Sequence, residues 1–564
     1  MSEPENIHHS VDAVVVGAGF AGLYQLHRLR GHGFSTRMFE RGGNVGGTWY
    51  WNRYPGARCD VESMQYSYSF DETLQQEWRW PEKFSAQPDI LAYLNHVADR
   101  FDLRKHIDFN TTVTAAHFNE PARCWAIETD KGERVSARFL IIATGCISTA
   151  QTPEIPGLPD YRGNTYHTGQ WPHRKVDFTG QRIAVIGTGS SGIQSIPILA
   201  EQAAHLTVFQ RTAHYSVPSR NFSMTPEYEQ EWKANYRARR AEMRYTNSGS
   251  MSKPNDLAAL KVSDEERQAI YRKRWEIGGL QFLRSFTDIL TSNEANETMA
   301  EFVRSQVRSI VKDPKTAELL APKSFPIGGK RLCVDSDYHN TFNRDNVELV
   351  DISGAGIERF TPTGLVANSR EFQFDSVIFA TGFDAMTGTL FRIDIRGRNA
   401  LALKEKWRAG PRSYLGIMSE AFPNLFTITG PGSPSVKSNM ITSIEQHVDF
   451  VTDALLHMRE HGFEVIEPEL DAENNWVDFV QDAASKTLFP YADSWYMGAN
   501  IPGKPRLFMP YIGGVGKYRR ICEEVVAQGY KGFHFHAQCA TEQRSTSTAS
   551  SEVLASSPSG RGLR

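Results

Sequence analysis

Apolar runs with the character of buried strands alternate along the chain with glycine-rich turns and helical spacing. One such series begins at Val11, a second begins at Arg182, and a third strand–turn pattern closes at 372–384. Continuous apolar runs are typical of strands covered on both faces, as in parallel sheets flanked by helices. The pattern predicts an α/β protein with more than one such sheet.

Between residues 221 and 326 the pattern changes. Glu, Arg, Lys, Gln and Ala recur at helical spacing, for example over 264–275, and strand-like runs are few. We interpret 222–326 as a helical insertion into an α/β domain. From Thr541 onward the chain is rich in Ser, Thr, Ala and Gly, which predicts a disordered tail over 541–564.

The first glycine-rich turn follows the apolar run 11–16 and contains Gly17, Gly19 and Gly22 at the spacing GxGxxG. Such glycines let the backbone approach a pyrophosphate, and the next helix offers N–H groups and a positive dipole at its N-terminus. Glu40 ends the following strand-like run. A carboxylate there accepts hydrogen bonds from both ribose hydroxyls but repels a 2′-phosphate. This turn predicts a site for an unphosphorylated adenosine, as in FAD or NAD.

The second glycine-rich turn follows the run 182–186 and repeats the spacing. It consists of Gly187, Thr188, Gly189, Ser190, Ser191 and Gly192. Its next strand-like run leads not to an acid but to Arg211 and Thr212. The planar fork of arginine suits a 2′-phosphate, with the threonine as a further donor. The alternative for Arg211 is a solvated charge at a strand end, but its register favours the phosphate of NADPH.

The two turns together predict two Rossmann-like dinucleotide-binding domains, one for FAD and one for NADP, with a helical insertion. The predicted boundaries are 1–145 and 381–540 for the two parts of the FAD-binding domain, 146–380 for the NADP-binding domain and 541–564 for the tail. We interpret two apolar runs that end in Thr-Gly, at 140–145 and 376–382, as the places where the chain passes between the domains; the alternative is a buried strand followed by a turn.

Composition narrows the class of protein without naming a reaction. The 564 residues include 62 Lys and Arg against 65 Asp and Glu, so no net field draws the protein to nucleic acid or anionic lipid. No apolar stretch is long enough for a membrane span, and residues 1–10 lack the apolar core of a signal peptide. We expect a cytoplasmic enzyme, a monomer or weak dimer, that binds neither nucleic acid nor membrane.

The cysteines argue against a flavin-dependent dithiol oxidoreductase, which needs a cysteine pair beside the flavin. None of the six pairs with another at CxxC or CxxxxC spacing: Cys59, Cys124, Cys146, Cys333, Cys522 and Cys539. The sequence therefore predicts neither a metal site nor a redox-active disulfide. Reductases of other acceptors, hydroxylating oxygenases and Baeyer–Villiger oxygenases remain.

A segment just before the second glycine-rich turn is more specific. Residues 161–172 read YRGNTYHTGQWP and resemble the signature FxGxxxHxxxWP of type I Baeyer–Villiger monooxygenases. Gly163, His167, Trp171 and Pro172 match, whereas Tyr161 stands where Phe is usual. This departure keeps the aromatic ring and adds a hydroxyl that needs a partner.

The resemblance extends over about residues 11–535. Segments 46–60, 329–332 and 494–504 are similar to a second family signature, to the segment bearing the active-site arginine and to the loop over the nicotinamide cofactor. The phenylacetone and steroid monooxygenase branch is the most similar in character.

The resemblance implies an FAD-containing, NADPH- and O2-dependent enzyme that converts ketones to esters or lactones. In such enzymes NADPH reduces the flavin, O2 forms a C4a-peroxyflavin, and this peroxide attacks the ketone to give a tetrahedral adduct. The implied substrates are aryl, cyclic or steroid-like ketones, with sulfides as a second class.

The resemblance also assigns roles to residues. Arg331 is expected to stabilise the anionic peroxide and adduct because arginine keeps its charge, and Asp60 is expected to hold Arg331 in place. Lys330 joins Arg211 at the 2′-phosphate. The expected cofactor contacts further include Thr48, Trp49, Asp60, Tyr66, Val113, Arg331, Met440 and, as a lid residue, Trp495.

Two residues keep alternative interpretations. Structural and catalytic roles are equally open for His167, which we interpret as a conformational coupler between the domains. Lys437 stands in a segment similar to the substrate-side loop of the family, where an apolar residue is usual. We expect it to point to solvent; the alternative is that it alters substrate preference.

Two other functions stay open at this point. A flavin-dependent N- or S-hydroxylating monooxygenase has a similar fold, but oxygen transfer to a heteroatom needs no cation like Arg331. A nucleotide-binding sensor without turnover is the third hypothesis.

Overall fold

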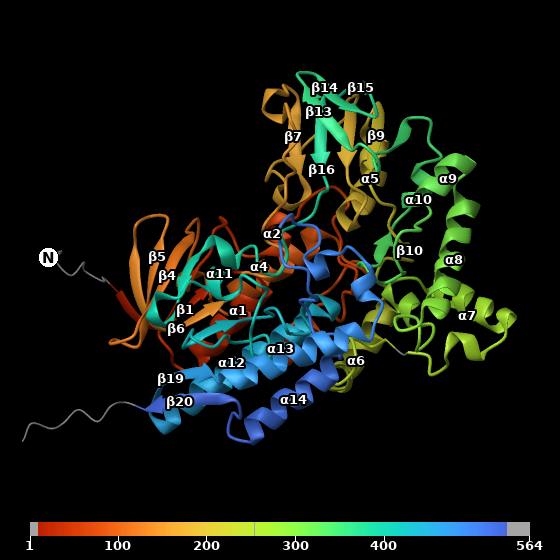
Figure 1. Ribbon diagram of the computed structural model, residues 1–564. Coiled ribbons are helices and arrows are strands. Elements are labelled where there is room, and N and C mark those ends of the chain that lie inside the picture. The colour runs from red at the N-terminus through yellow and green to blue at the C-terminus, as the bar shows by residue number, and fades with distance from the viewer. Residues whose placement is uncertain (1–8, 253, 538–564) are drawn as a thin grey trace, which may run out of the picture.

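Figure 1 shows the computed structural model, which describes residues 9–252 and 254–537. Two sheets covered by helices form separate parts of the molecule, the larger one on the left of the figure and the smaller one at the top. The predicted tail at 541–564 lies outside the described residues and stays a prediction.

The larger sheet has the strand order β17-β4-β5-β6-β1-β2-β3, with β18 added to β6. Its strands are β1 (His9–Val16), β2 (Thr36–Phe39), β3 (Ile107–Asp108), β4 (Val113–Asn119), β5 (Cys124–Thr129), β6 (Arg134–Ile142), β17 (Asp394–Arg396) and β18 (Leu425–Thr427). Strand β5 pairs with the first half of β6, and β18 pairs in parallel with its last three residues. The sheet therefore joins two parts of the chain that are distant in sequence.

The smaller sheet is parallel throughout and has the order β12-β9-β8-β16-β7. Its strands are β7 (Asn164–His167), β8 (Arg182–Ile186), β9 (His205–Gln210), β12 (Val347–Asp351) and β16 (Ser376–Phe379). The chain enters this sheet after β6 and leaves it after β16, where the two Thr-Gly runs stand. The predicted α/β class with two dinucleotide-binding sheets is confirmed.

Successive residues of β1 explain why its sequence is apolar without interruption. Ala13 and Val15 pack into one core with α1 (Phe20–Gly31) and α12 (Met440–His461), whereas Val14 and Val16 pack into a second core on the other face. Because side chains alternate across a strand, a strand covered on both sides has no polar face. The same division holds for the two faces of β8.

The remaining elements cover these sheets or connect them. The short strands are β10 (Ser216–Pro218), β11 (Cys333–Asp335), β13 (Ile357–Thr361), β14 (Gly364–Ala367), β15 (Arg370–Gln373), β19 (Phe463–Pro468) and β20 (Phe533–Ala537). The other helices outside the insertion are α2 (Thr48–Trp51), α3 (Glu72–Glu77), α4 (Gln87–Arg100), α5 (Ser190–Gln202), α10 (Tyr338–Thr341), α11 (Leu403–Lys406), α13 (Leu470–Ser485) and α14 (Val515–Ala527). Among the described residues, no helix is long and apolar enough to cross a membrane.

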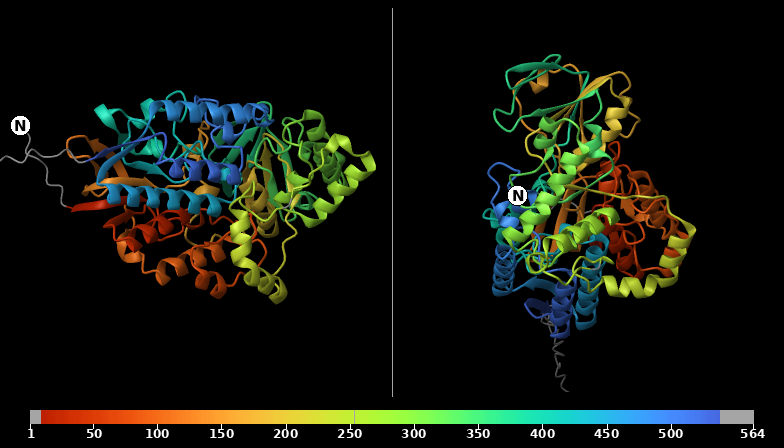
Figure 2. Two further views of the ribbon diagram at one scale, coloured as in Figure 1. Left: turned by 90° about the horizontal axis from the view of Figure 1, so that it is seen from below. Right: turned by 90° about the vertical axis from the view of Figure 1, so that its right-hand side faces the viewer.

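The segment 222–326 is helical, as its spacing indicates. It contains α6 (Pro226–Met243), α7 (Asp264–Ile277), α8 (Asn293–Ile310) and α9 (Pro314–Leu320). Helices α7 and α8 share a core of their own with β10 and β11. In the left view of Figure 2 the green part of this segment, α7 to α9, lies at the end of the molecule opposite β1.

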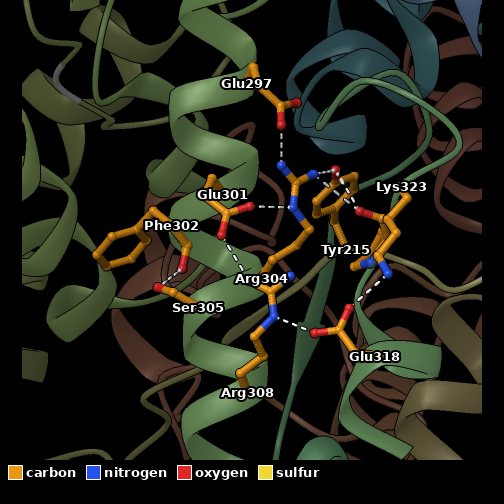
Figure 3. Close-up of polar contacts among 10 residues, drawn as sticks. Tyr215, Glu297, Glu301, Phe302, Arg304, Ser305, Arg308, Glu318 and Lys323 are labelled. Atoms are coloured by element: carbon orange, nitrogen blue, oxygen red, sulfur yellow. Dashed lines mark hydrogen bonds and ion pairs between the residues drawn. The ribbon is translucent and has the colours of Figure 1, made fainter. Parts of the chain in front are cut away.

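Arg304 on α8 joins this helix to the end of the insertion, which leads to Arg331, and to Tyr215 outside the insertion (Figure 3). Its Nη1 donates to the carbonyl oxygen of Pro322 and to the hydroxyl of Tyr215, each at 3.3 Å. Its Nε donates to Glu301 at 2.8 Å. The side chain is only 8% exposed, so its hydrogen bonds replace water for groups that are buried on folding.

We predict that Arg304→Ala lowers the free energy of unfolding by about 2 kcal/mol, because the buried Tyr215 hydroxyl and the carbonyl oxygen of Pro322 each lose a charge-assisted hydrogen bond. The matched control is Arg308→Ala, one turn further along α8, where the more exposed guanidinium pairs with Glu301 and Glu318. Loss of an exposed pair changes stability by about 0.5 kcal/mol or less. Urea unfolding followed by tryptophan fluorescence compares the two variants, and equal losses would contradict the role of Arg304.

Candidate active site

The first glycine-rich turn joins β1 to α1 and leaves no room for side chains. Gly17 has φ of +104°, and a Cβ there would lie 2.8 Å from the carbonyl oxygen of Ala143. A Cβ on Gly22 would lie 1.8 Å from the carbonyl oxygen of Gly17. Helix α1 starts after Gly19 with no side-chain cap. Its first N–H groups therefore remain available to a phosphate.

Glu40 follows β2, as predicted, and its carboxylate holds the turn together. Oε2 accepts a hydrogen bond from the N–H of Ala18 at 2.7 Å, and Oε1 accepts one from Gly42 at 2.6 Å. The side chain is buried. Each carboxylate oxygen keeps a second lone pair, so this position is compatible with the predicted bonds to a ribose.

The second glycine-rich turn repeats this geometry between β8 and α5. Gly187 has φ of +109°, and a Cβ there would lie 2.6 Å from the carbonyl oxygen of Ala380. A Cβ on Gly192 would lie 2.3 Å from the carbonyl oxygen of Gly187. By contrast, no described atom lies within 4 Å of a Cβ built on Gly189, after which α5 starts without a side-chain cap. The turn is therefore tightly packed at Gly187 and Gly192, whereas the space at Gly189, next to the helix N-terminus, is open. This arrangement suits a pyrophosphate.

Hydroxyl groups fix the second turn to its neighbours. Thr188 Oγ1 donates to the carbonyl oxygen of Thr212 at 3.0 Å. The hydroxyls of Ser191 and Thr168 lie 3.0 Å apart, and Ser190 Oγ lies 3.3 Å from Cys333 Sγ. These bonds hold the turn against the segments that carry the predicted phosphate-binding residues.

Arg211 and Lys330 come together beside this turn, as predicted. Burial lowers the pKa of Lys330, and the charge of Arg211 lowers it further. Lys330 Nζ lies 4.7 Å from the ring centroid of Phe325. In the described part of the chain, neither cation forms an ion pair with a carboxylate. Two neighbouring cations of this kind form a site for a phosphate.

Arg331 and Asp60 form the ion pair at the centre of the candidate site. Nη2 and Nε of Arg331 donate to Oδ2 of Asp60 at 2.6 and 3.0 Å, and Nη1 donates to the carbonyl oxygen of Val436 at 2.9 Å. Burial opposes the charge of Arg331, but the carboxylate of Asp60 outweighs it and raises the pKa of the guanidinium. Arg331 is therefore a fixed, permanent cation.

Tyr496, which was not predicted from the sequence, lies beside Arg331. Burial raises the pKa of Tyr496 to about 12, against the opposing charge of Arg331. Its buried hydroxyl faces the guanidinium of Arg331, a group that only donates, so among the described residues the Tyr496 O–H has no acceptor. Its position directly after Trp495 was the available signal, but nothing in the local sequence indicates which way the ring points.

Three of the other predicted cofactor residues open secondary-structure elements, and two more, Trp49 and Tyr66, bond to each other. Thr48 opens α2, Met440 opens α12, and Trp49 Nε1 donates to the hydroxyl of Tyr66 at 3.2 Å. Val113 opens β4 with its side chain in the core of the larger sheet. Only the backbone of Val113 is therefore in a position to bind a cofactor, and these contacts stay predictions.

The signature segment builds the edge of the smaller sheet. The Tyr161 hydroxyl finds its partner in the carbonyl oxygen of Phe374 at 3.0 Å. A Cβ on Gly163 would lie 2.2 Å from that hydroxyl, which explains the glycine. Trp171, followed by Pro172, is buried and packs 5.3 Å from Tyr166, measured between ring centroids.

His167 is the last residue of β7. It lies between the two segments that connect the larger and the smaller sheet, one after β6 and one after β16. Its Nδ1 accepts from the N–H of Gly169 at 2.9 Å, and its Nε2 lies 3.3 Å from Gln151 O and 3.3 Å from Thr381 Oγ1. Burial lowers the pKa of His167, which favours the neutral ring. Gln151 and Thr381 belong to different connections, so the position suits a coupler, and this role stays a prediction.

The loop with Trp495 is tied to the second connection. Lys504 Nζ donates to Asp384 Oδ1 and to the carbonyl oxygen of Ala385, each at 2.6 Å. Asn500 Nδ2 donates to the carbonyl oxygen of Phe383 at 2.7 Å. These bonds fix the base of the loop that carries η10 (Trp495–Met497).

The expectation that Lys437 points to solvent is wrong. Its Nζ lies 4.1 Å from the ring centroid of Phe489 and 4.7 Å from that of Tyr496. Burial lowers its pKa to about 7, and the charge of Arg331 acts in the same direction. The ammonium is directed into the site because aromatic faces attract it.

These features fit two dinucleotides. Both turns present uncapped helix N-termini, an acid follows one of them, and a pair of cations lies beside the other. The first fits the adenosine and pyrophosphate of FAD, and the second fits NADP. The described residues contain no group of three or more His, Cys, Asp or Glu side chains suited to a metal ion.

Known proteins share this arrangement over nearly the whole chain. A family model described as pyridine nucleotide–disulphide oxidoreductase matches residues 14–277. A Baeyer–Villiger monooxygenase of Pseudooceanicola batsensis is 42% identical over 523 residues, which cover 92% of this chain and 95% of that protein. The solved structure of an oxidized steroid monooxygenase bound to NADP is 51% identical, with a TM-score of 0.90, and covers 94% of this chain and 100% of its own.

A solved structure of OTEMO in complex with FAD and NADP is 40% identical, with a TM-score of 0.90, and covers 93% of this chain and 99% of its own. Similarity of this extent goes beyond a shared fold. The chain belongs to the type I Baeyer–Villiger monooxygenases, enzymes that use FAD and NADPH to convert ketones to esters or lactones.

Proposed function

We propose that this enzyme oxidises aryl, cyclic or steroid-like ketones beside Arg331, with sulfides as a second class of substrate. The observation that carries the proposal is the Arg331–Asp60 ion pair at an apolar wall. That wall is formed by Cys146, Ala385, Met386, Val436, Phe489, Tyr496 and Met497. An apolar wall with one fixed cation suits a molecule that is apolar except for a carbonyl group.

FAD, when bound, supplies the reduced ring that takes up O2 and passes one oxygen atom to the substrate. Arg331 provides the charge that stabilises the ketone oxygen as it becomes negative. Because Asp60 and the carbonyl of Val436 already fix the guanidinium, no reorganisation is needed when that charge develops. Asp60 thus positions Arg331.

Arg211, Thr212 and Lys330 select NADPH over NADH by binding its 2′-phosphate. The loop held by Lys504 and Asp384 also carries Tyr496, which lies beside Arg331. We propose that this loop excludes water from the Arg331 site. Oxygen transfer to a sulfide forms no oxyanion that needs stabilisation. We therefore propose that sulfides need only the apolar wall for binding and do not depend on the charge of Arg331.

We predict that Arg331→Ala lowers ester formation at least about a hundredfold, because the developing oxyanion loses its fixed cation. Reduction of the flavin by NADPH should continue. Stopped-flow absorbance measures flavin reduction, and mass spectrometry measures the ester. Arg308→Ala serves as the control for loss of a guanidinium far from the site.

Normal ester formation by Arg331→Ala would overturn the assignment. Sulfide oxidation is the internal comparison, since it should fall less than ester formation in the same variant. Equal losses for sulfides and ketones would argue that Arg331 is needed for an earlier step.

We predict that Arg211→Ala and Lys330→Ala each raise KM for NADPH about tenfold, because each removes a charged bond to the 2′-phosphate. KM for NADH should change by less than about twofold, since NADH carries no phosphate there. Steady-state kinetics with both coenzymes measures this difference. The exposed Lys315→Ala is the matched control, and equal effects on NADPH and NADH would contradict the site.

A further inference from the structure

Lys437 adds a second positive charge at the Arg331 site. It ends the 3₁₀ helix η8 (Ser435–Lys437), directly after Val436, whose carbonyl oxygen accepts the bond from Arg331. Asp60 already pairs with Arg331. Throughout the described ranges, 9–252 and 254–537, no carboxylate forms an ion pair with Lys437. The site therefore has two cations and one anion.

The surroundings of Lys437 attract its charge but do not neutralise it. Its Nζ faces the rings of Phe489 and Tyr496, which are 1% and 0% exposed. An aromatic face offsets part of the loss of hydration but carries no net charge. Burial, with Arg331 second, lowers the pKa of Lys437 to about 7, which reflects the cost of this unpaired ammonium.

Tyr496 provides a second polar group at the same place. Its ring lies under Lys437 Nζ, and its buried hydroxyl faces Arg331 as an acceptor only, so its own O–H finds no acceptor among the described side chains and backbone. Buried hydroxyls are normally satisfied. A free O–H donor beside an unpaired ammonium matches the two needs of a bound carboxylate, a charge and a hydrogen bond.

We propose that Lys437 and Tyr496 form a carboxylate subsite beside Arg331, which makes keto acids the preferred ketone substrates. The inference rests on the proposed function, because it assumes that the ketone reacts beside Arg331. It concerns only which ketones are preferred.

Charge balance favours a monoanion. With Arg331 and Lys437 positive and Asp60 negative, one further negative charge makes the group neutral. A phosphate dianion would leave an excess negative charge against the apolar wall, which is unfavourable. A carboxylate also accepts two bonds at once, one from the ammonium and one from the hydroxyl.

The test compares aryl keto acids with their methyl esters, from benzoylpropionate to benzoylvalerate. Each pair differs in its charge and in one methyl group, so the change in the ratio of their kcat/KM values between wild type and Lys437 variants isolates the subsite. For at least one chain length we expect the wild type to prefer the acid at least about tenfold, the effect of one charge-assisted bond. Oxidised product is measured by mass spectrometry.

Variants of Lys437 connect the preference to the residue. Lys437→Leu and Lys437→Gln should bring the acid-to-ester ratio down at least about tenfold, and Tyr496→Phe should lower it less. The matched control is Lys486→Leu, which removes an exposed lysine paired with Asp482. It should leave the ratio unchanged. Bound flavin, measured by absorbance, shows that each variant is folded.

The pH dependence provides an independent measurement. As the pH rises from about 6 to about 9, Lys437 loses its proton while the carboxylate stays ionised, so the wild-type ratio should fall. The groups facing Lys437 do not titrate in this interval: Arg331 keeps its charge, and burial raises the pKa values of Tyr496 and Cys146 above it. Lys437→Arg should still prefer the acid over the ester, and its acid-to-ester ratio should not fall as the pH rises, because arginine keeps its charge.

Three results would overturn the subsite: no acid preference at any chain length, an equal fall for acid and ester in Lys437→Leu, or a raised KM for NADPH in that variant. The last would assign the ammonium to the coenzyme. Oxidation of the methyl esters by the wild type tests the proposed function separately, so the two failures are distinguishable.

Discussion

The site depends on one constraint, that Arg331 must stay charged and immobile in a place where charge is unfavourable. A guanidinium resists deprotonation, but burial alone would favour its displacement towards water. Asp60 prevents this with two hydrogen bonds to one oxygen, and the carbonyl of Val436 fixes the remaining end. The cation is thus oriented before any substrate arrives, which is the condition for electrostatic stabilisation.

The Arg331–Asp60 ion pair also connects two segments that are distant in the sequence. Asp60 belongs to the segment between β2 and β3 of the larger sheet, whereas Arg331 follows the helical insertion just before β11. The pair therefore joins the two nucleotide-binding parts of the chain. Arg304 acts on the same segment from the other side, because it binds the backbone at Pro322 between α9 and Arg331.

The sequence alone predicted the parts that follow from local rules. Continuous apolar strands, glycines without room for a Cβ, and the acid or arginine after each turn depend on short stretches of chain, and the structure has them where they were expected. The direction of Lys437 did not follow, because the aromatic rings that attract it come from a segment about fifty residues away. Tyr496 was missed for the same reason.

The near-zero net charge of the chain conceals how unevenly charge is distributed at the site. Arg211 and Lys330 lie together and form no ion pair with a carboxylate of the described residues, and this suits a phosphate that arrives with the coenzyme. Arg331 has Asp60 and needs no ligand to stay in place. Lys437 differs from both groups, since it is half-buried like Arg331 but, among the described residues, forms no ion pair, like Lys330. An unpaired cation with little hydration is unfavourable unless a ligand of opposite charge binds to it. The charge of Lys437 is therefore more important for substrate binding than for the stability of the fold.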